Sequence, residues 1–258
     1  MSENTTPEKE NLYNISSLDR AIIVLEAFSE SRPELTLTEI VGVTGLHKAT
    51  AFRLLAFLCR RHLVAKDANT GRYRLGLRMV AFANVAKAHN NLIAEARKIM
   101  AELSDETMQT VYLSVRIGDL RFDIEQQVSG LTETMLSTRL AQPKLLEVGA
   151  AGAVMLASTP DEEIEAYLVR TSKSRLPSTD LDLLWRNIRR IRKQGYGESK
   201  GGSGLSAIST PVWGVADEFL GTISMILPMD KFEQERGAMA QKLVACAKRL
   251  SASLGAGL

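Results

Sequence analysis

The stretch from Gly45 to Leu58 most constrains how this chain can fold, because it has the pattern of a helix with two different faces. Apolar side chains that recur at positions i, i+3, i+4 and i+7 form one stripe along a helix and pack against a core. The members of this stripe are Ala51, Leu54, Leu55 and Leu58. The other face carries hydrogen-bond donors, cations and one aromatic ring near the amino end of the helix. Its members are His47, Lys48, Thr50, Phe52 and Arg53.

A second, shorter helix is expected immediately before this one. Thr36 and Glu39 have the spacing of a capping box, in which each side chain bonds the other residue's backbone N–H. Gly42 and Gly45 predict the end of that helix. Two short helices joined by a glycine-containing turn form a helix-turn-helix. The same pattern also occurs in helical hairpins that only pack a small domain, so the pattern alone leaves both interpretations open.

The distribution of charge favours DNA binding over simple packing. Between Leu46 and Lys87 there are nine basic residues and a single acid, a local net charge of +8. The whole chain has a net charge of only +2, so the remainder sums to −6. Positive charge concentrated around one recognition helix is typical of a protein that binds nucleic acid.

Two further elements complete the first domain. Residues 62–65 and 72–75 predict two strands joined by a turn over 67–71, which together form a wing that carries Arg72 and Arg74 to the phosphate backbone. A helix that begins at Ser16 or Ser17 is expected to pack through Leu18, Ile22, Leu25 and Phe28. Residues 77–87 predict a helix that leads out of the domain.

Bulk composition bounds the remaining possibilities. With 258 residues, 45% apolar and 24% charged, the chain is long enough for two globular domains. No apolar run reaches the length that crosses a bilayer, and the amino-terminal residues lack the apolar segment of a signal peptide, so we expect a cytoplasmic protein with no membrane contact. Cys59 and Cys246 match no metal-ligand spacing, and we expect reduced thiols, no metal and no cofactor.

From Asn90 onward the pattern predicts a mixed α+β domain. Strands are expected at 111–115 and 122–127, joined through Gly118 and Asp119, and again at 205–212 and 219–227. Amphipathic helices are expected at 92–103, after Pro160, over 181–193 and from about Asp230. Antiparallel pairs at both ends, with helices between them, are typical of a ligand-sensing domain.

Several motifs, specific only in combination, make residues 16–258 resemble the IclR-type transcriptional regulators. They are Leu35–Ile40 with Thr44–Leu55, Tyr73–Gly76, Gly195–Tyr196 and Ser209–Val212. The resemblance implies an α/β fold of the α+β type, with an N-terminal winged helix-turn-helix, a linker helix and a C-terminal GAF-like effector-binding domain with an antiparallel sheet. It implies a disordered tail at 1–15, the DNA-binding domain at 16–78, the linker at 79–91 and the effector-binding and oligomerisation domain at 92–258.

The resemblance also implies a function. The chain is expected to be a repressor of a catabolic operon that binds double-stranded operator DNA as a homodimer or a dimer of dimers and responds to a small organic acid. The expected DNA-binding residues are Thr36, Thr38, His47, Lys48, Thr50, Phe52, Arg53, Arg72 and Arg74. The expected effector-binding residues are Leu136, Leu140, Ala150, Ala151, Ser199, Leu205, Ala207, Ser224 and Ile226.

The candidate effector residues depart from the family pattern at two positions. Ser199 stands where the family usually has an acid, with Glu198 beside it as an alternative acid, and Ile226 replaces the later of two serines. A mostly apolar lining with two free backbone amides predicts an aromatic or medium-sized aliphatic carboxylate. The run Gly149–Ala153 has two compatible interpretations, a helix start that packs closely on a neighbour and an anion site made by free N–H groups.

An enzyme interpretation competes with the regulator. Gly197 to Gly201 spells G-x-S-x-G, the pattern of a hydrolase nucleophile turn. That motif requires a buried strand before it and a histidine after it, whereas an Arg-rich helix precedes it and every histidine lies upstream. The alternative is therefore a small-molecule-binding or hydrolase-like module that does not bind DNA, and the regulator is the favoured interpretation.

Overall fold

The computed structural model describes residues 16–29, 31–88, 90–129, 143–171, 178–201 and 204–257. The expected tail at 1–15 lies outside these residues. The chain divides into two compact units, one that ends at Ala88 and one that begins at His89.

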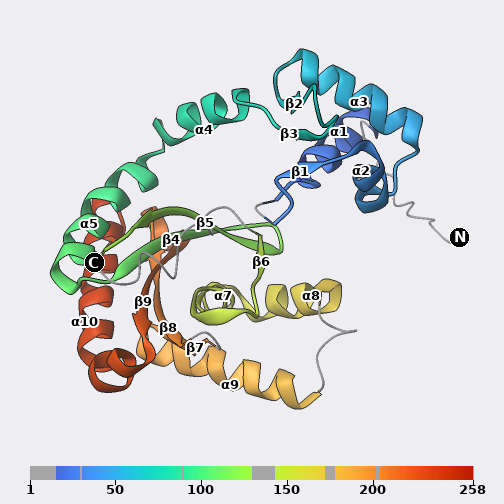
Figure 1. The fold of residues 1–258 in the computed structure, drawn as a ribbon. Coiled ribbons are helices and arrows are strands. Elements are labelled where there is room, and N and C mark those ends of the chain that lie inside the picture. The colour runs from blue at the N-terminus through green and yellow to red at the C-terminus, as the bar shows by residue number, and fades with distance from the viewer. Residues whose placement is uncertain are drawn as a thin grey trace, which may run out of the picture. The chain divides into compact units, whose positions relative to one another are not determined.

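The first unit combines helices with a small antiparallel sheet (Figure 1). The helices are α1 (Ser16–Glu26), α2 (Leu37–Thr44), α3 (Lys48–Arg60) and α4 (Arg78–Ala88). The strands, in the sheet order β1-β3-β2, are β1 (Glu34–Leu35), β3 (Tyr73–Leu75) and β2 (Val64–Lys66). The helix-turn-helix and the wing hairpin are both present, and β1 adds a third strand that was not predicted.

The core of the first unit confirms the apolar stripe of α3 and only part of the one predicted for α1. Ala51, Leu55 and Leu58 are buried and Leu54 is half-buried. On α1, by contrast, Leu18 and Ile22 are exposed, whereas Val24 is buried, as are Ala27 and Phe28 just after the helix. The prediction was correct for Leu25 and Phe28 and wrong for Leu18 and Ile22, because only the carboxyl end of this segment packs into the cluster formed with α2, α3 and the wing.

Two local features explain why these elements begin and end where they do. The capping box is present at α2, where Thr36 Oγ1 accepts the Glu39 N–H and a Glu39 carboxylate oxygen accepts the Thr36 N–H. Gly45, with φ of +68°, ends this helix in the left-handed conformation. At Gly76 a Cβ atom would lie 2.1 Å from the carbonyl oxygen of His62, so only glycine permits the wing to close against this loop.

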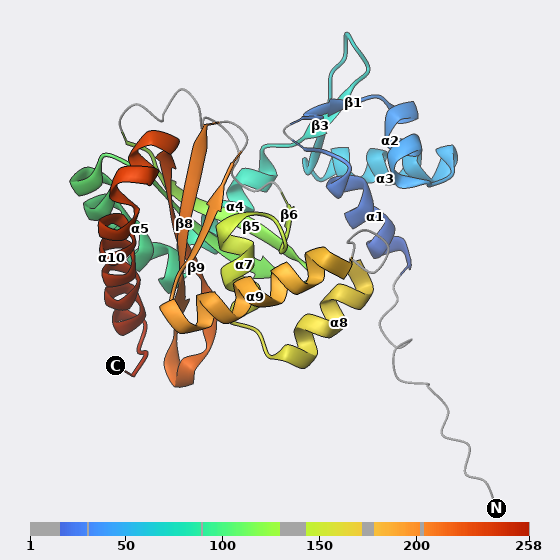
Figure 2. The ribbon, with the colours of Figure 1, turned by 90° about the horizontal axis from the view of Figure 1, so that it is seen from below.

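The second unit is built on a six-stranded antiparallel sheet (Figures 1 and 2). Its order is β6-β5-β4-β9-β8-β7, and the strands are β4 (Thr110–Ile117), β5 (Leu120–Gln127), β6 (Lys144–Leu145), β7 (Gly197–Lys200), β8 (Leu205–Trp213) and β9 (Phe219–Pro228). The helices are α5 (Asn91–Thr107), α7 (Gly149–Ala157), α8 (Asp161–Thr171), α9 (Ser178–Gln194) and α10 (Met229–Ser253).

Helices cover the two faces of this sheet in separate layers. α5 and α10 lie side by side on one face, and α7 covers the other face and packs against α9, as Figures 1 and 2 show. A large apolar cluster joins α5 and α10 to the face of the sheet that they cover. A second cluster joins α7, α8 and α9. The second unit is therefore a three-layer α/β/α structure.

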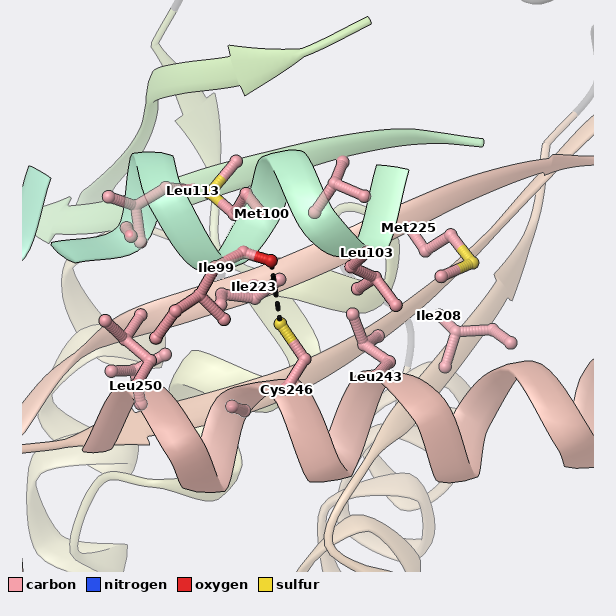
Figure 3. Packing of buried hydrophobic residues seen from close by; sticks show 14 of the residues in the cluster. Ile99, Met100, Leu103, Leu113, Ile208, Ile223, Met225, Leu243, Cys246 and Leu250 are labelled. Carbon is pink, nitrogen blue, oxygen red and sulfur yellow. Dashed lines mark hydrogen bonds between the residues drawn. The ribbon is translucent and has the colours of Figure 1, made fainter. Parts of the chain in front are cut away.

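Cys246 lies within the large cluster. Its Sγ donates to the Ile99 carbonyl oxygen at 3.9 Å, from α10 to α5 (Figure 3). Burial raises the pKa of this thiol to about 12. Both cysteines are free, and among the described residues no group of histidine, cysteine and carboxylate side chains is placed to hold a metal.

The main difference from the predicted elements lies near Ser199. The glycine-rich stretch from Gly197, where no strand was predicted, begins as β7, which pairs with β8 so that Ser199 lies opposite Ala207. Backbone pairing outweighs the low strand propensity of these residues because β8 offers a free edge. Within the described segments, no helix has the length and apolarity needed to cross a membrane.

Candidate functional site

The exposed face of α3 presents most of the residues expected to contact DNA. His47, which precedes the helix, is exposed, as are Lys48, Phe52 and Arg53, whereas Thr50 is half-buried. Among the described residues, neither Lys48 nor Arg53 forms an ion pair. Because the opposite face is held in the core, these side chains are presented on a rigid element.

Thr36 and Thr38 lie on the first turns of α2 and differ in their freedom to bind. The Thr36 hydroxyl is engaged by the Glu39 amide at 3.2 Å, and this side chain is half-buried. Thr38 is exposed. Of the two side chains, that of Thr38 is the more accessible to a phosphate, and the Thr36 hydroxyl keeps its own O–H as a donor.

The wing cations are paired within the chain. Arg72 Nη1 donates to the Glu34 carbonyl oxygen at 3.1 Å and lies 3.4 Å from Glu39 Oε2. Arg74 Nη1 lies 3.6 Å from Glu34 Oε1. Glu34 and Glu39 lie before Leu46, where the count of +8 began. They therefore neutralise part of the positive charge of the wing, although the count did not include them.

The second unit contains a cavity of about 170 Å³ between the sheet and the amino end of α7. Six of the predicted effector residues line it; they are Ala150, Ala151, Ser199, Ala207, Ser224 and Ile226. The other residues that line it are Tyr112, Ser114, Arg121, Asp123, Lys144 and Gly149.

Strand alternation explains which strand residues reach this cavity. Successive side chains of a strand point to opposite faces. On β9, Ile223 and Met225 enter the large core with α5 and α10, whereas Ser224 and Ile226 line the cavity. Residues of β4 alternate in the same way, because Leu113 is in the core and Ser114 lines the cavity.

Of the three remaining predicted effector residues, the structure describes only Leu205. Leu205 is half-buried at the start of β8, opposite Pro228, and is not part of the lining. Leu136 and Leu140 lie outside the described residues. Glu198, the alternative acid, is also absent from the lining, because it alternates with Ser199 along β7.

The amino end of α7 meets β7 closely. The Ala150 amide donates to Ser199 Oγ at 3.1 Å, so it is not one of two free amides, which corrects that expectation. A Cβ at Gly152 would lie 2.2 Å from the Leu146 carbonyl oxygen, so close packing demands a glycine there. Gly149 has φ of +75°, which favours glycine.

Three charged residues of the cavity were missed by the sequence reasoning. Arg121 and Asp123 are both more than nine-tenths buried, and Arg121 Nε lies 3.5 Å from Asp123 Oδ1. Asp123 Oδ2 lies 2.5 Å from Lys144 Nζ, and Asp123 Oδ1 accepts from Ser114 Oγ at 2.6 Å. The lining is therefore more polar than expected. The alternation of polar and apolar residues in β5 predicts that Arg121 and Asp123 share one face of the strand. Only the tertiary structure shows that this face is buried.

Ser224 lies in a polar pair that was also unexpected. Its hydroxyl bonds that of Ser209, which is its direct partner on the neighbouring strand. The Ser209 hydroxyl also contacts the Ile223 carbonyl oxygen at 3.4 Å. The Ser224 hydroxyl thus already has a partner within the protein.

The geometry around Ser199 does not suit a hydrolase. Ser199 lies within a strand and not at a strand-to-helix turn, and its hydroxyl accepts the Ala150 amide. Of the three histidines, the two that are described, His47 and His62, belong to the first unit. No described histidine can therefore activate this hydroxyl within the second unit.

Comparison with known proteins identifies both units. Residues 17–68 match the IclR helix-turn-helix domain, and residues 85–252 match the domain described as bacterial transcriptional regulator IclR C-terminal. The chain is 25% identical over 247 residues to the HTH-type transcriptional regulator XynR of Escherichia coli, covering 93% of this chain and 98% of that protein. It is 26% identical over 249 residues to the HTH-type transcriptional repressor AllR of Salmonella typhi, covering 93% of this chain and 90% of that protein.

Solved structures agree with this assignment. An IclR transcriptional regulator from Alicyclobacillus acidocaldarius superposes with a TM-score of 0.81 at 25% identity, covering 94% of this chain and 100% of that chain. An IclR homologue from Microbacterium hydrocarbonoxydans, solved in complex with 4-hydroxybenzoate, has the same fold, with a TM-score of 0.76 at 20% identity over 92% of this chain and 98% of that chain. The relatives are regulators and not enzymes. The chain belongs to the IclR family of DNA-binding transcriptional regulators, with an N-terminal helix-turn-helix and a C-terminal effector domain.

Proposed function

We propose that this chain is a cytoplasmic repressor of a catabolic operon that releases its operator when a small organic acid binds in the cavity beside α7. The observation that carries the proposal is the two-faced helix α3, which buries Ala51 and Leu55 and leaves Lys48 and Arg53 exposed and unpaired among the described residues. The second unit is compact and has its own cavity, and in this proposal it binds the effector that controls DNA binding.

In this proposal α3 enters the major groove of the operator. Arg53 holds a phosphate or a guanine edge, His47, Lys48 and Thr50 contact base edges, and Phe52 meets a thymine methyl group. Thr36 and Thr38 contact the phosphate backbone from α2. Arg72 and Arg74 exchange their internal carboxylate partners for phosphates, which stabilises binding without reading the sequence.

The test of this arrangement is the operator affinity of the Arg53→Ala variant, measured by fluorescence anisotropy on the promoter fragment upstream of its own gene. Losing one base or phosphate contact costs about 1–3 kcal/mol, which weakens binding roughly 5- to 150-fold. Arg20→Ala, which removes an exposed arginine from α1, is the matched control and should retain affinity. If Arg53→Ala bound the operator as tightly as the unaltered protein, the placement of α3 would be wrong.

The effector class rests on the lining of the cavity. Small and apolar side chains such as Ala151, Ala207 and Ile226 suit the hydrocarbon body of an aromatic or medium-sized aliphatic acid. The amino end of α7 suits its carboxylate. The related Microbacterium protein binds an acid of this class, 4-hydroxybenzoate.

The Ala150→Asp variant tests the position of that carboxylate. An aspartate at the start of α7 places a like charge where the ligand carboxylate is expected, and should abolish both the thermal stabilisation and the release of operator by organic acids. Ala150→Ser, which adds a small uncharged group, is the matched control. An Ala150→Asp protein that still responded to acids would refute this site.

We propose a homodimer, or a dimer of dimers, because the first unit exposes apolar side chains that a single chain leaves uncovered. Leu77, just before α4, is 86% exposed, and on α4 Val85 is 63% exposed and Val80 and Phe82 are also exposed. A second copy of the chain would bury them, and a dimer places two recognition helices on a two-fold symmetric operator.

A further inference from the structure

Arg121 has an unsatisfied donor in the cavity. Its side chain is more than nine-tenths buried, and its Nη1 donates to the Val148 carbonyl oxygen at 3.3 Å. Its Nε is buried without a hydrogen-bond partner, because the contact with Asp123 Oδ1 at 3.5 Å does not have hydrogen-bond geometry. A buried charged donor left unpaired is costly, so this guanidinium is placed for an acceptor that the protein itself does not supply.

The amino end of α7 reaches the same point. A Cβ built on Gly149 would lie 3.7 Å from Arg121 Nη1 and 3.9 Å from Ser199 Oγ, so the guanidinium and this hydroxyl flank the first turn of the helix. The partial positive charge of a helix amino terminus adds to that of the guanidinium. Burial also lowers the pKa of Arg121, as expected of a cation that lacks full compensation.

The charges that line the cavity favour a ligand with a single negative charge. Arg121 and Lys144 are cations and Asp123 is an anion, which leaves one unit of positive charge among the described lining residues. One carboxylate neutralises this excess. A second carboxylate would add a buried negative charge close to Asp123 without a cation of its own.

Asp123 provides a second recognition point. Its two oxygens accept from Ser114 Oγ and contact Lys144 Nζ, and a carboxylate has about four acceptor positions. A position therefore remains for a donor from the ligand. A hydroxyl group supplies such a donor, and Lys144, with further N–H groups, can donate to the same hydroxyl oxygen.

The size of the cavity suits a small body between these two points. Its volume of about 170 Å³ is close to the ~150 Å³ that accommodates a benzene molecule in an engineered protein cavity. We infer that the effector is a compact hydroxy monocarboxylic acid whose carboxylate is held by Arg121 and the first turn of α7 and whose hydroxyl is held by Asp123 and Lys144. This inference rests on the proposed control by an organic acid and names its chemical class.

The test uses the full-length protein and a matched set of small molecules. Thermal stabilisation and operator affinity are measured with 3-hydroxybutyrate, butyrate, succinate and 3-hydroxybutyramide, and with 4-hydroxybenzoate, benzoate and 4-hydroxybenzamide. The expected result is that a hydroxy monoacid from one series stabilises the protein and changes operator affinity. Its deoxy analogue should bind at least tenfold more weakly, and the amide and the diacid should not bind.

Two variants test which residue binds the carboxylate of the ligand and which binds its hydroxyl group. Arg121→Gln should reduce the affinity for the hydroxy acid at least tenfold. Asp123→Asn should remove the preference for the hydroxy acid over its deoxy analogue. Arg116→Gln is the matched control, because Arg116 is the direct partner of Arg121 in the β4–β5 register but bonds Thr159 and Glu163 outside the cavity.

The outcomes separate this inference from the proposed function. If an acid changes operator affinity but binds Arg121→Gln as tightly as the unaltered protein, the anchor is wrong and the regulator remains. If butyrate, benzoate or succinate acts as well as the hydroxy acids, the assigned class is wrong. If no acid in either series changes stability or operator affinity while operator binding is intact, control by a compact organic acid fails together with this inference.

Discussion

Arg72 Nη1 lies 3.4 Å from Glu39 Oε2, which joins the wing to the first turn of α2 by an ion pair. The same Glu39 oxygen accepts the Thr36 N–H at 2.7 Å in the capping box. One carboxylate thus begins a helix of the helix-turn-helix and positions the adjacent wing. The two parts of the proposed DNA-binding surface are coupled through this residue.

Removing the cap should destabilise the first unit. Thr36→Ala loses the bond from the Glu39 amide and is expected to cost about 1 kcal/mol of unfolding free energy, a fall in Tm of roughly 4–8 °C for a domain of this size. Differential scanning calorimetry of the full chain measures it. Thr38→Ala, at an exposed position on the same helix, should change Tm little, and equal effects of the two variants would show that the cap contributes nothing.

The first unit should lose stability in acid through Glu39. Backbone and side-chain hydrogen bonds with Thr36, and the charge of Arg72, lower the pKa of Glu39 below its ordinary value of 4.5. A lowered pKa in the folded state means that the contribution to stability is complete above pH 4.5 and is lost as the pH falls through the folded-state value. In Glu39→Gln this part of the acid-induced fall in Tm should be absent. An unchanged pH profile would exclude Glu39 as a source of the acid sensitivity.

The wing cations should act through phosphates. Arg74→Ala is expected to weaken binding to operator and to unrelated duplexes alike, and to reduce the slope of log affinity against log salt by about one. Glu34→Gln removes the internal partner of Arg74 and should strengthen binding to unrelated DNA. Arg170→Ala, an exposed arginine of the second unit, is the control. A loss of affinity confined to the operator would instead assign base recognition to Arg74.

The exposed apolar residues of α4 should hold the dimer together. Phe82→Glu places a charge in the expected interface and should shift sedimentation equilibrium towards monomer, with weaker operator binding as a consequence. Ala83→Glu adds the same charge at an exposed position in the arc of the helix that carries none of Val80, Phe82 and Val85, and should leave the dimer intact. A dimer that persists in Phe82→Glu would remove this face of α4 from the interface.

Much of the local structure could be predicted, because it depends on short-range geometry. The spacing of Ala51, Leu55 and Leu58 predicts the buried face of α3, and the spacing of Thr36 and Glu39 predicts where α2 begins. The hairpin at Gly118 and the strands β8 and β9 follow from alternation and turn residues. These features repeat every two or 3.6 residues along the chain, so they can be recognised without knowing its neighbours.

The charged residues of the cavity could not be predicted, because residues with the same local sequence pattern have different surroundings in the folded chain. Arg116 and Arg121 are direct partners in one hairpin, yet Arg121 lines the cavity and Arg116 bonds residues at the start of α8. The count of basic residues likewise missed Glu34 and Glu39, which neutralise the wing cations.

The sequence by itself determined the family, the helix-turn-helix with its wing, the α+β character of the second unit and most of the small residues that line its cavity. Only the tertiary structure decided that Arg121, Asp123 and Lys144 meet beside α7, that Ser199 lies on a strand, and that Leu18 and Ile22 are exposed. The backbone period determines which way a side chain points. What covers that side chain depends on segments far away in sequence, whose packing no local pattern records.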